Sequence, residues 1–88
     1  MSQARKRLEA MRGNPRGDWR IDDIETICRA YGVDCRSPSG GGSHYTVSHA
    51  SQAEILTIPY NRPIKVIYIK KFVAFIDEVE RSTYDGRK

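Results

Sequence analysis

The stretch that decides the fold is DWRIDDIETICRAYGVDCRSPSGGGSHYTVSH, residues 18–49. In its first half the apolar residues from Ile24 to Tyr31 follow the spacing i, i+3, i+4, i+7, which is one face of an α-helix. Gly32 then interrupts this pattern, as a glycine just beyond a helix commonly does. The second half alternates apolar and polar residues around a glycine-rich turn, which is typical of paired strands. The stretch therefore predicts a helix over about 18–31, with Asp18 as its N-cap, followed by a β-hairpin.

The segments that follow extend this pattern to a small mixed fold. A third strand is expected at 55–60, where Pro59 indicates a strand end or a sheet edge. A second amphipathic helix is expected at about 67–81, because apolar residues recur there with helical spacing. Short connections favour antiparallel pairing, and two helices can cover only one face of so small a sheet. The predicted fold is therefore α+β, with two helices on one face of a three-stranded antiparallel sheet made of residues 33–37, 43–49 and 55–60.

Length and composition exclude several classes of protein. The chain has 88 residues, which is enough for one small domain and one modest core. No apolar run approaches the length of a membrane span, and the N-terminus has no apolar segment typical of a secretory signal. Cys28 and Cys35 form no C-x-x-C pair, so neither a disulfide framework nor a four-cysteine zinc site is expected. These features predict a reduced, cytoplasmic protein without membrane, metal or cofactor.

The positive charge is concentrated at the N-terminus. The formal net charge is +4, and residues 1–20 hold six cations against two anions, whereas residues 21–88 hold nine of each. This asymmetry predicts a basic arm or linker over 1–17, a domain over 18–81 and a polar tail over 82–88. A basic arm suggests a polyanionic partner, although a merely solubilising arm would have the same composition.

His44 is the residue that carries most information about chemistry. Strand alternation puts it on the face opposite Tyr45 and Val47, so it faces solvent if those two face the helices. Imidazole titrates near neutral pH and can act as an acid or a base, but a surface histidine without a role is the simpler alternative. Neighbouring Ser43 would point away from His44, and His49 lies an odd number of residues away, so neither completes a catalytic pair.

Cations and aromatic side chains around the sheet are consistent with RNA as the substrate. RNA cleavage needs an acid or base near the 2′-hydroxyl and cations to hold the phosphate. Exposed tyrosines and tryptophan can also stack on bases, although Tyr45 is better explained as part of the core. The candidate cations are Arg36, Arg62, Lys65, Lys70 and Lys71, and the candidate stacking residues are Trp19, Tyr45, Tyr60 and Tyr68.

The chain resembles the HicA family of toxins over about residues 14–80. HicA proteins are small mRNA-cleaving toxins with a double-stranded-RNA-binding-domain-like α-β-β-β-α fold, and HicB antitoxins neutralise them. The order of several short motifs carries the resemblance, and the element Gly42-Ser43-His44 is the most specific of them. The others are Asn14-Pro15, Ala30-Tyr31-Gly32-Val33, His49 at the end of the second strand, Leu56-Thr57-Ile58-Pro59 and the segment from Lys65 to Phe72.

The resemblance implies a toxin that acts as an endoribonuclease on mRNA, with a HicB-type protein as its partner. It makes His44 the catalytic residue, and we expect Gly42 and Ser43 to position the strand end while Arg36 and Lys65 contact phosphates. The family commonly has a second histidine where this chain has Tyr45. Two alternatives therefore stay open: an RNA-binding module of the same fold without catalysis, and an interaction domain that acts only through a protein partner.

Overall fold

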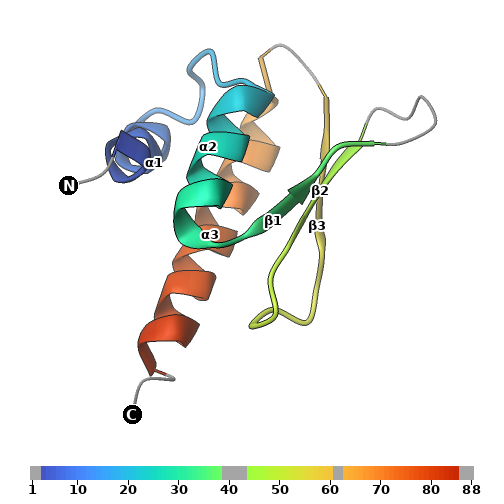
Figure 1. Cartoon of the computed structure of the whole chain (residues 1–88). Helices are drawn as coiled ribbons and strands as arrows, with labels where there is room; N and C mark the ends of the chain where they lie inside the picture. Colours follow the sequence, from blue (N-terminus) through green and yellow to red (C-terminus); the bar gives the residue numbers. More distant parts are fainter. Residues whose placement is uncertain (1–2, 39–43, 61–62, 86–88) are drawn as a thin grey trace.

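The computed structural model describes residues 3–38, 44–60 and 63–85 of the chain, and these form an α+β fold with an open sheet (Figure 1). No helix in these ranges is long and apolar enough to cross a membrane. The elements follow in the order α1 (Gln3–Gly13), α2 (Ile21–Tyr31), β1 (Asp34–Arg36), β2 (His44–Ser48), β3 (Leu56–Pro59) and α3 (Val66–Asp85).

The three strands form the predicted antiparallel meander. Their spatial order is β1-β2-β3, so β2 lies in the centre and β3, which ends at Pro59, forms one edge. The register pairs Cys35 with Val47 and Tyr45 with Ile58, and these residues face the helices. Val47 and Ile58 are fully buried there. The alternation predicted from the sequence is therefore confirmed.

Helices α2 and α3 cover one face of this sheet (Figure 1). Each contributes a stripe of apolar side chains to a single core, because residues three and four apart project from the same side of a helix. Within the described residues, the other face of the sheet has no helix against it (Figure 1). The core residues of α2 are Ile21, Ile24, Ile27 and Cys28, and those of α3 are Ile69, Phe72, Val73, Ile76 and Val79.

Helix α2 begins later than the sequence pattern predicted. Its N-cap is Arg20 rather than Asp18, because the carboxylate of Asp23 accepts the backbone N–H of Arg20 at 2.9 Å. Asp18 instead forms an ion pair with the guanidinium of Arg20. The helix ends as predicted at Gly32, which adopts the left-handed conformation with φ 69°.

The expected arm over 1–17 is wrong for most of its length, because residues Gln3–Gly13 form the helix α1. This helix packs against α2 and α3, on the side of the helix pair away from the sheet (Figure 1). Its inner face buries Ala4, Leu8 and Met11 in the core. The N-terminal segment is thus a third layer of the domain.

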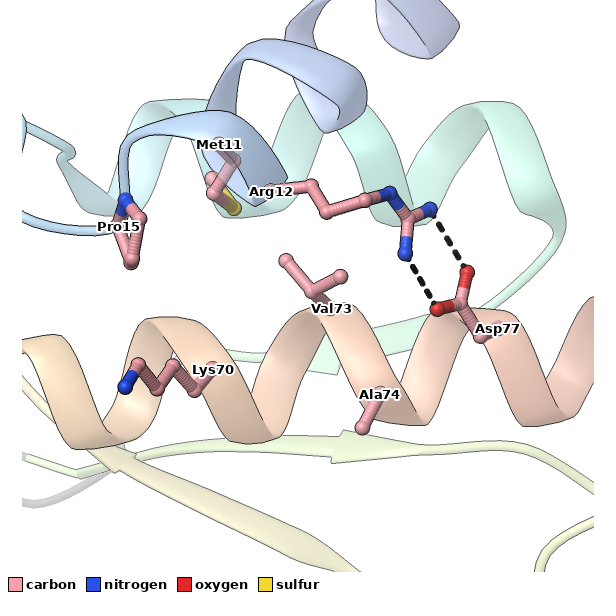
Figure 2. A pocket seen from close by; sticks show the side chains of 7 residues that line it. All are labelled: Met11, Arg12, Pro15, Lys70, Val73, Ala74 and Asp77. Carbon is pink, nitrogen blue, oxygen red and sulfur yellow. Dashed lines mark hydrogen bonds and ion pairs between the residues drawn. The ribbon is translucent and has the colours of Figure 1, made fainter.

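Ion pairs from α1 to the other two helices use the cations that the arm was expected to offer. Arg7 forms an ion pair with Asp23 of α2, and Arg5 lies 3.6 Å from the carboxylate of Glu80. Arg12 contacts both carboxylate oxygens of Asp77 on α3, at 2.7 and 3.0 Å (Figure 2). Paired planar groups of this kind fix orientation as well as charge. Three of the four cations of α1 are therefore paired with carboxylates of the other two helices.

The predicted polar tail is also partly helical. Helix α3 continues to Asp85, four residues beyond the expected end at residue 81, and residues 86–88 lie outside the described part. The sequence between Ser82 and Asp85 contains no proline or glycine, so nothing in it stops a helix. The sequence of residues 82–85 does not continue the apolar stripe of Ile69 to Val79, which is why the pattern did not reveal this last turn.

We expect Leu8→Ala to destabilise the whole domain, because the Leu8 side chain is only 1% exposed. The expected loss is about 2–5 kcal/mol in the free energy of unfolding, measured by urea denaturation. Lys6→Ala is the matched control on the exposed side of the same helix, and it should change that free energy by less than about 0.5 kcal/mol. Equal, small effects of both variants would show that α1 does not belong to the core.

Asp23 holds two contacts at once, since one carboxylate oxygen caps α2 and the other binds Arg7. We therefore expect Asp23→Ala to lower the free energy of unfolding by about 1–3 kcal/mol, because two charge-assisted hydrogen bonds are lost. Asp22→Ala removes the same charge from the same helical turn and should cost only about 0.3–1 kcal/mol through the helix dipole. Equal losses in thermal denaturation would contradict this role of Asp23.

Candidate functional site

The uncovered side of the sheet, which we call the open face, is built from every second residue of each strand. Cross-strand partners in an antiparallel sheet project to the same side, so the register identifies its members. It is polar: it carries one cation, one anion and one imidazole among hydroxyl side chains. The open face consists of Asp34 and Arg36 from β1, His44, Thr46 and Ser48 from β2, and Thr57 and Pro59 from β3.

His44 lies on the open face where the sequence placed it. It is the first residue of β2, pairs with Pro59 of β3, and has an exposed side chain. Its imidazole forms no hydrogen bond or ion pair with the residues of 3–38, 44–60 or 63–85. Both ring nitrogens are therefore open, within that part of the chain, to a ligand on the open face.

Arg36 is the cation that the fold brings beside His44. It pairs with Thr46, which is two residues from His44 on the same side of β2. Diagonal neighbours of this kind lie about 7–8 Å apart, which a long arginine side chain can span. Arg36 is exposed and has no ion-pair partner within the described ranges. The imidazole and the guanidinium can thus contact adjacent groups of one ligand.

The remaining predicted cations do not gather on the open face. Lys65 immediately precedes α3 and accepts the backbone N–H groups of Tyr68 and Ile69 at its carbonyl, so it borders the helix layer. Lys70 lies in the cleft between α1 and α3, away from the sheet (Figure 2). The Nζ of Lys71 lies 6.0 Å from the ring centroid of Tyr68, and Lys71 lines a groove beside the β3 edge. Arg62 is outside the described residues.

Tyr60 is an exposed aromatic side chain, but it lies with Tyr45 on the helix side of the sheet and not on the open face. It follows the cross-strand partner of His44, is 46% exposed, and has its ring 6.1 Å from that of Tyr45. Trp19, in contrast, is half-buried and donates its indole N–H to the carbonyl of Asn14 at 2.7 Å. Trp19 is therefore part of the connection between α1 and α2.

Tyr45 does not replace a second catalytic histidine. It lies on the helix side of β2, where it packs against the core, whereas His44 points to the open face. Desolvation raises the pKa of its phenol above an already high value, so Tyr45 stays neutral near pH 7. A histidine at this position on a regular strand would also have pointed away from His44. The described part of the open face therefore carries a single imidazole, that of His44.

His49 has a structural role at the opposite end of β2. Its Nδ1 accepts the backbone N–H of Ser51 at 3.0 Å and lies 2.8 Å from the Ser51 hydroxyl, within the turn that leads to β3. Five residues of extended chain separate it from His44 by roughly 16 Å. The two histidines cannot act on the same bond.

The remaining predicted site residues, Gly42 and Ser43, lie outside the described residues, so their expected role stays a prediction. In the described part, no three His, Cys, Asp or Glu side chains lie close enough to hold a metal ion. The open face carries fewer cations than the sequence predicted. Among the expected cations that the structure describes, only Arg36 belongs to a strand, so cross-strand register would have indicated this.

Comparison of the chain with protein-family models, with curated proteins and with solved structures gave no match. The resemblance to the HicA family therefore rests on the motifs quoted above.

Proposed function

We propose that the protein is a metal-independent endoribonuclease that cleaves mRNA on the open face of its sheet, as the toxin of a toxin–antitoxin pair. The observation that supports this most is the placement of exposed His44 diagonally from exposed Arg36 on a sheet face that no helix covers. The HicA-like motifs support the same function and add a HicB-type antitoxin as partner.

In the proposed reaction, His44 removes the proton from a ribose 2′-hydroxyl. The 2′-oxygen then attacks the neighbouring phosphorus and expels the 5′-oxygen of the next nucleotide, which leaves a 2′,3′-cyclic phosphate. Arg36 binds the nonbridging phosphate oxygens and stabilises the charge that develops on them. The conjugate imidazolium can return the proton to the leaving oxygen. An open face suits this chemistry, because a single RNA strand can lie across it.

We infer that Tyr60 stacks on a base beyond the edge of the open face, because its ring lies beside that of Tyr45 on the helix side of the sheet and not beside His44. Its ring is exposed beyond the end of β3, one residue past the partner of His44. Stacking on one aromatic ring contributes about 1–3 kcal/mol per base and tolerates different sequences. We infer that Tyr60 contributes to RNA affinity more than to the choice of sequence.

Purified protein is incubated with a labelled single-stranded RNA in EDTA to test this function. We expect cleavage that ends in cyclic phosphate, and His44→Ala should lower the initial rate by a factor of about 10²–10⁴, since it removes the acid–base group. His49→Ala is the matched control, because it removes an imidazole from the same strand far from the site. It should cleave at the rate of the parent.

Three results of this assay would change the proposal. Cleavage by His44→Ala at the parental rate would exclude His44 as the catalytic residue. Salt-sensitive RNA binding by the parent without any cleavage would favour the non-catalytic RNA-binding module. Neither binding nor cleavage would favour an interaction domain, and the chain should then leave bacterial growth unaffected when it is expressed alone.

A further inference from the structure

A second chemically reactive place lies on the helix side of the sheet, where the two cysteines meet. Cys28 is in the last turn of α2 and Cys35 is the central residue of β1. The chain reverses between them at Gly32, and the N–H of Val33 donates to the carbonyl of Cys28 at 2.8 Å. This turn brings β1 back along the end of α2.

The two side chains point toward each other across this junction. Cys35 pairs with buried Val47, which places it on the side of the sheet that faces α2. Cys28 belongs to the buried stripe of α2. Both are free thiols, and both line the same pocket at this junction. Two cysteines that face each other across so short a connection need little backbone movement to form a covalent bond.

The two thiols differ in access and in acidity. Cys28 is buried, whereas Cys35 is partly exposed at a pocket of about 300 Å³ that Glu25 and Arg29 also line. The neighbouring Cys28 S–H lowers the pKa of Cys35, against the opposing effect of burial. The same interaction, together with burial, raises the pKa of Cys28. Cys35 is therefore the thiol that ionises first and the one that a small molecule can reach.

We propose that Cys28 and Cys35 form a reactive dithiol, in which Cys35 attacks low-molecular-weight disulfides and Cys28 resolves the product into a disulfide between α2 and β1. This modification site is separate from the open face and does not depend on the proposed ribonuclease activity. The pocket beside Cys35 provides space for the disulfide that this thiolate attacks.

The reaction proceeds by two exchanges. The Cys35 thiolate attacks one sulfur of a disulfide RSSR, which gives a mixed disulfide and releases RS⁻. Cys35 then no longer offers a thiolate to the Cys28 S–H, so the main cause of the high pKa of Cys28 is gone. Cys28 loses its proton and attacks the Cys35 sulfur, which releases the second R group as RS⁻. Both thiolates take up protons, so two protein thiols are oxidised while RSSR is reduced to two RSH.

The folded protein is treated with bis(2-hydroxyethyl) disulfide, a small neutral reagent, and analysed by intact mass and by mapping of peptides without reduction. We expect the parent to lose two hydrogen atoms, retain no adduct and contain a peptide that links Cys28 to Cys35. Cys28→Ala should retain one mercaptoethanol group on Cys35, because nothing resolves the mixed disulfide. Cys35→Ala should react more than about tenfold more slowly, since a buried thiol is inert.

Other outcomes would overturn the proposal. A parent that keeps a stable adduct on Cys35 would show that Cys28 does not reach it. Equal reaction rates of the two alanine variants would show that the two thiols do not differ in reactivity. Disulfides formed only between two chains would show that Cys28 and Cys35 of one chain do not form a disulfide with each other. Circular dichroism confirms that each variant is folded before its rate is compared, and the parent result stands without either variant.

Discussion

The fold depends on one constraint: the three-stranded sheet has a single apolar face, and α2 and α3 together cover it. Val47 and Ile58 occupy the centre of that face, and the stripe of α3 around Phe72 packs over them. Burial of this surface is the main source of stability, because the ion pairs of so small a domain are largely exposed. Since the apolar residues of the strands face the helices, the open face is left with mostly polar side chains.

Helix α1 changes how the charge of the chain should be understood. Its apolar side completes the core from outside the helix pair, and its arginines bind carboxylates of α2 and α3. Much of the positive charge near the N-terminus is therefore paired with carboxylates of the same domain. In the proposed complex, contact with RNA relies mainly on Arg36, because the other expected cations that the structure describes lie outside the strands. A sheet face with so little charge would bind an RNA strand mainly through contacts of individual side chains rather than through long-range electrostatic attraction.

Most elements could be predicted from local pattern, because strand alternation and helical stripes report directly which side is buried. Helix α1 could not, since only Ala4, Leu8 and Met11 mark its inner face among many charged residues. The start of α2 was predicted too early, because Asp18 and Asp23 compete for the role of capping residue. The contact of Asp23 with Arg7 favours Asp23. For the candidate site, the alternation of apolar and polar residues along the strand was enough to place His44 on the open face. The separation of Lys65 and Lys70 from the open face, and the contact between Cys28 and Cys35, depend on how distant elements pack.

In the proposed function, RNA binds on the open face of the sheet. NMR titration of the labelled protein with a short RNA analogue that carries 2′-deoxy nucleotides measures this directly, because the analogue binds without being cut. The account predicts that backbone amide signals of Arg36, His44 and Thr57 shift together and saturate with one affinity. Shifts confined to α1 and the outer side of α3, around Lys6 and Lys70, would contradict it.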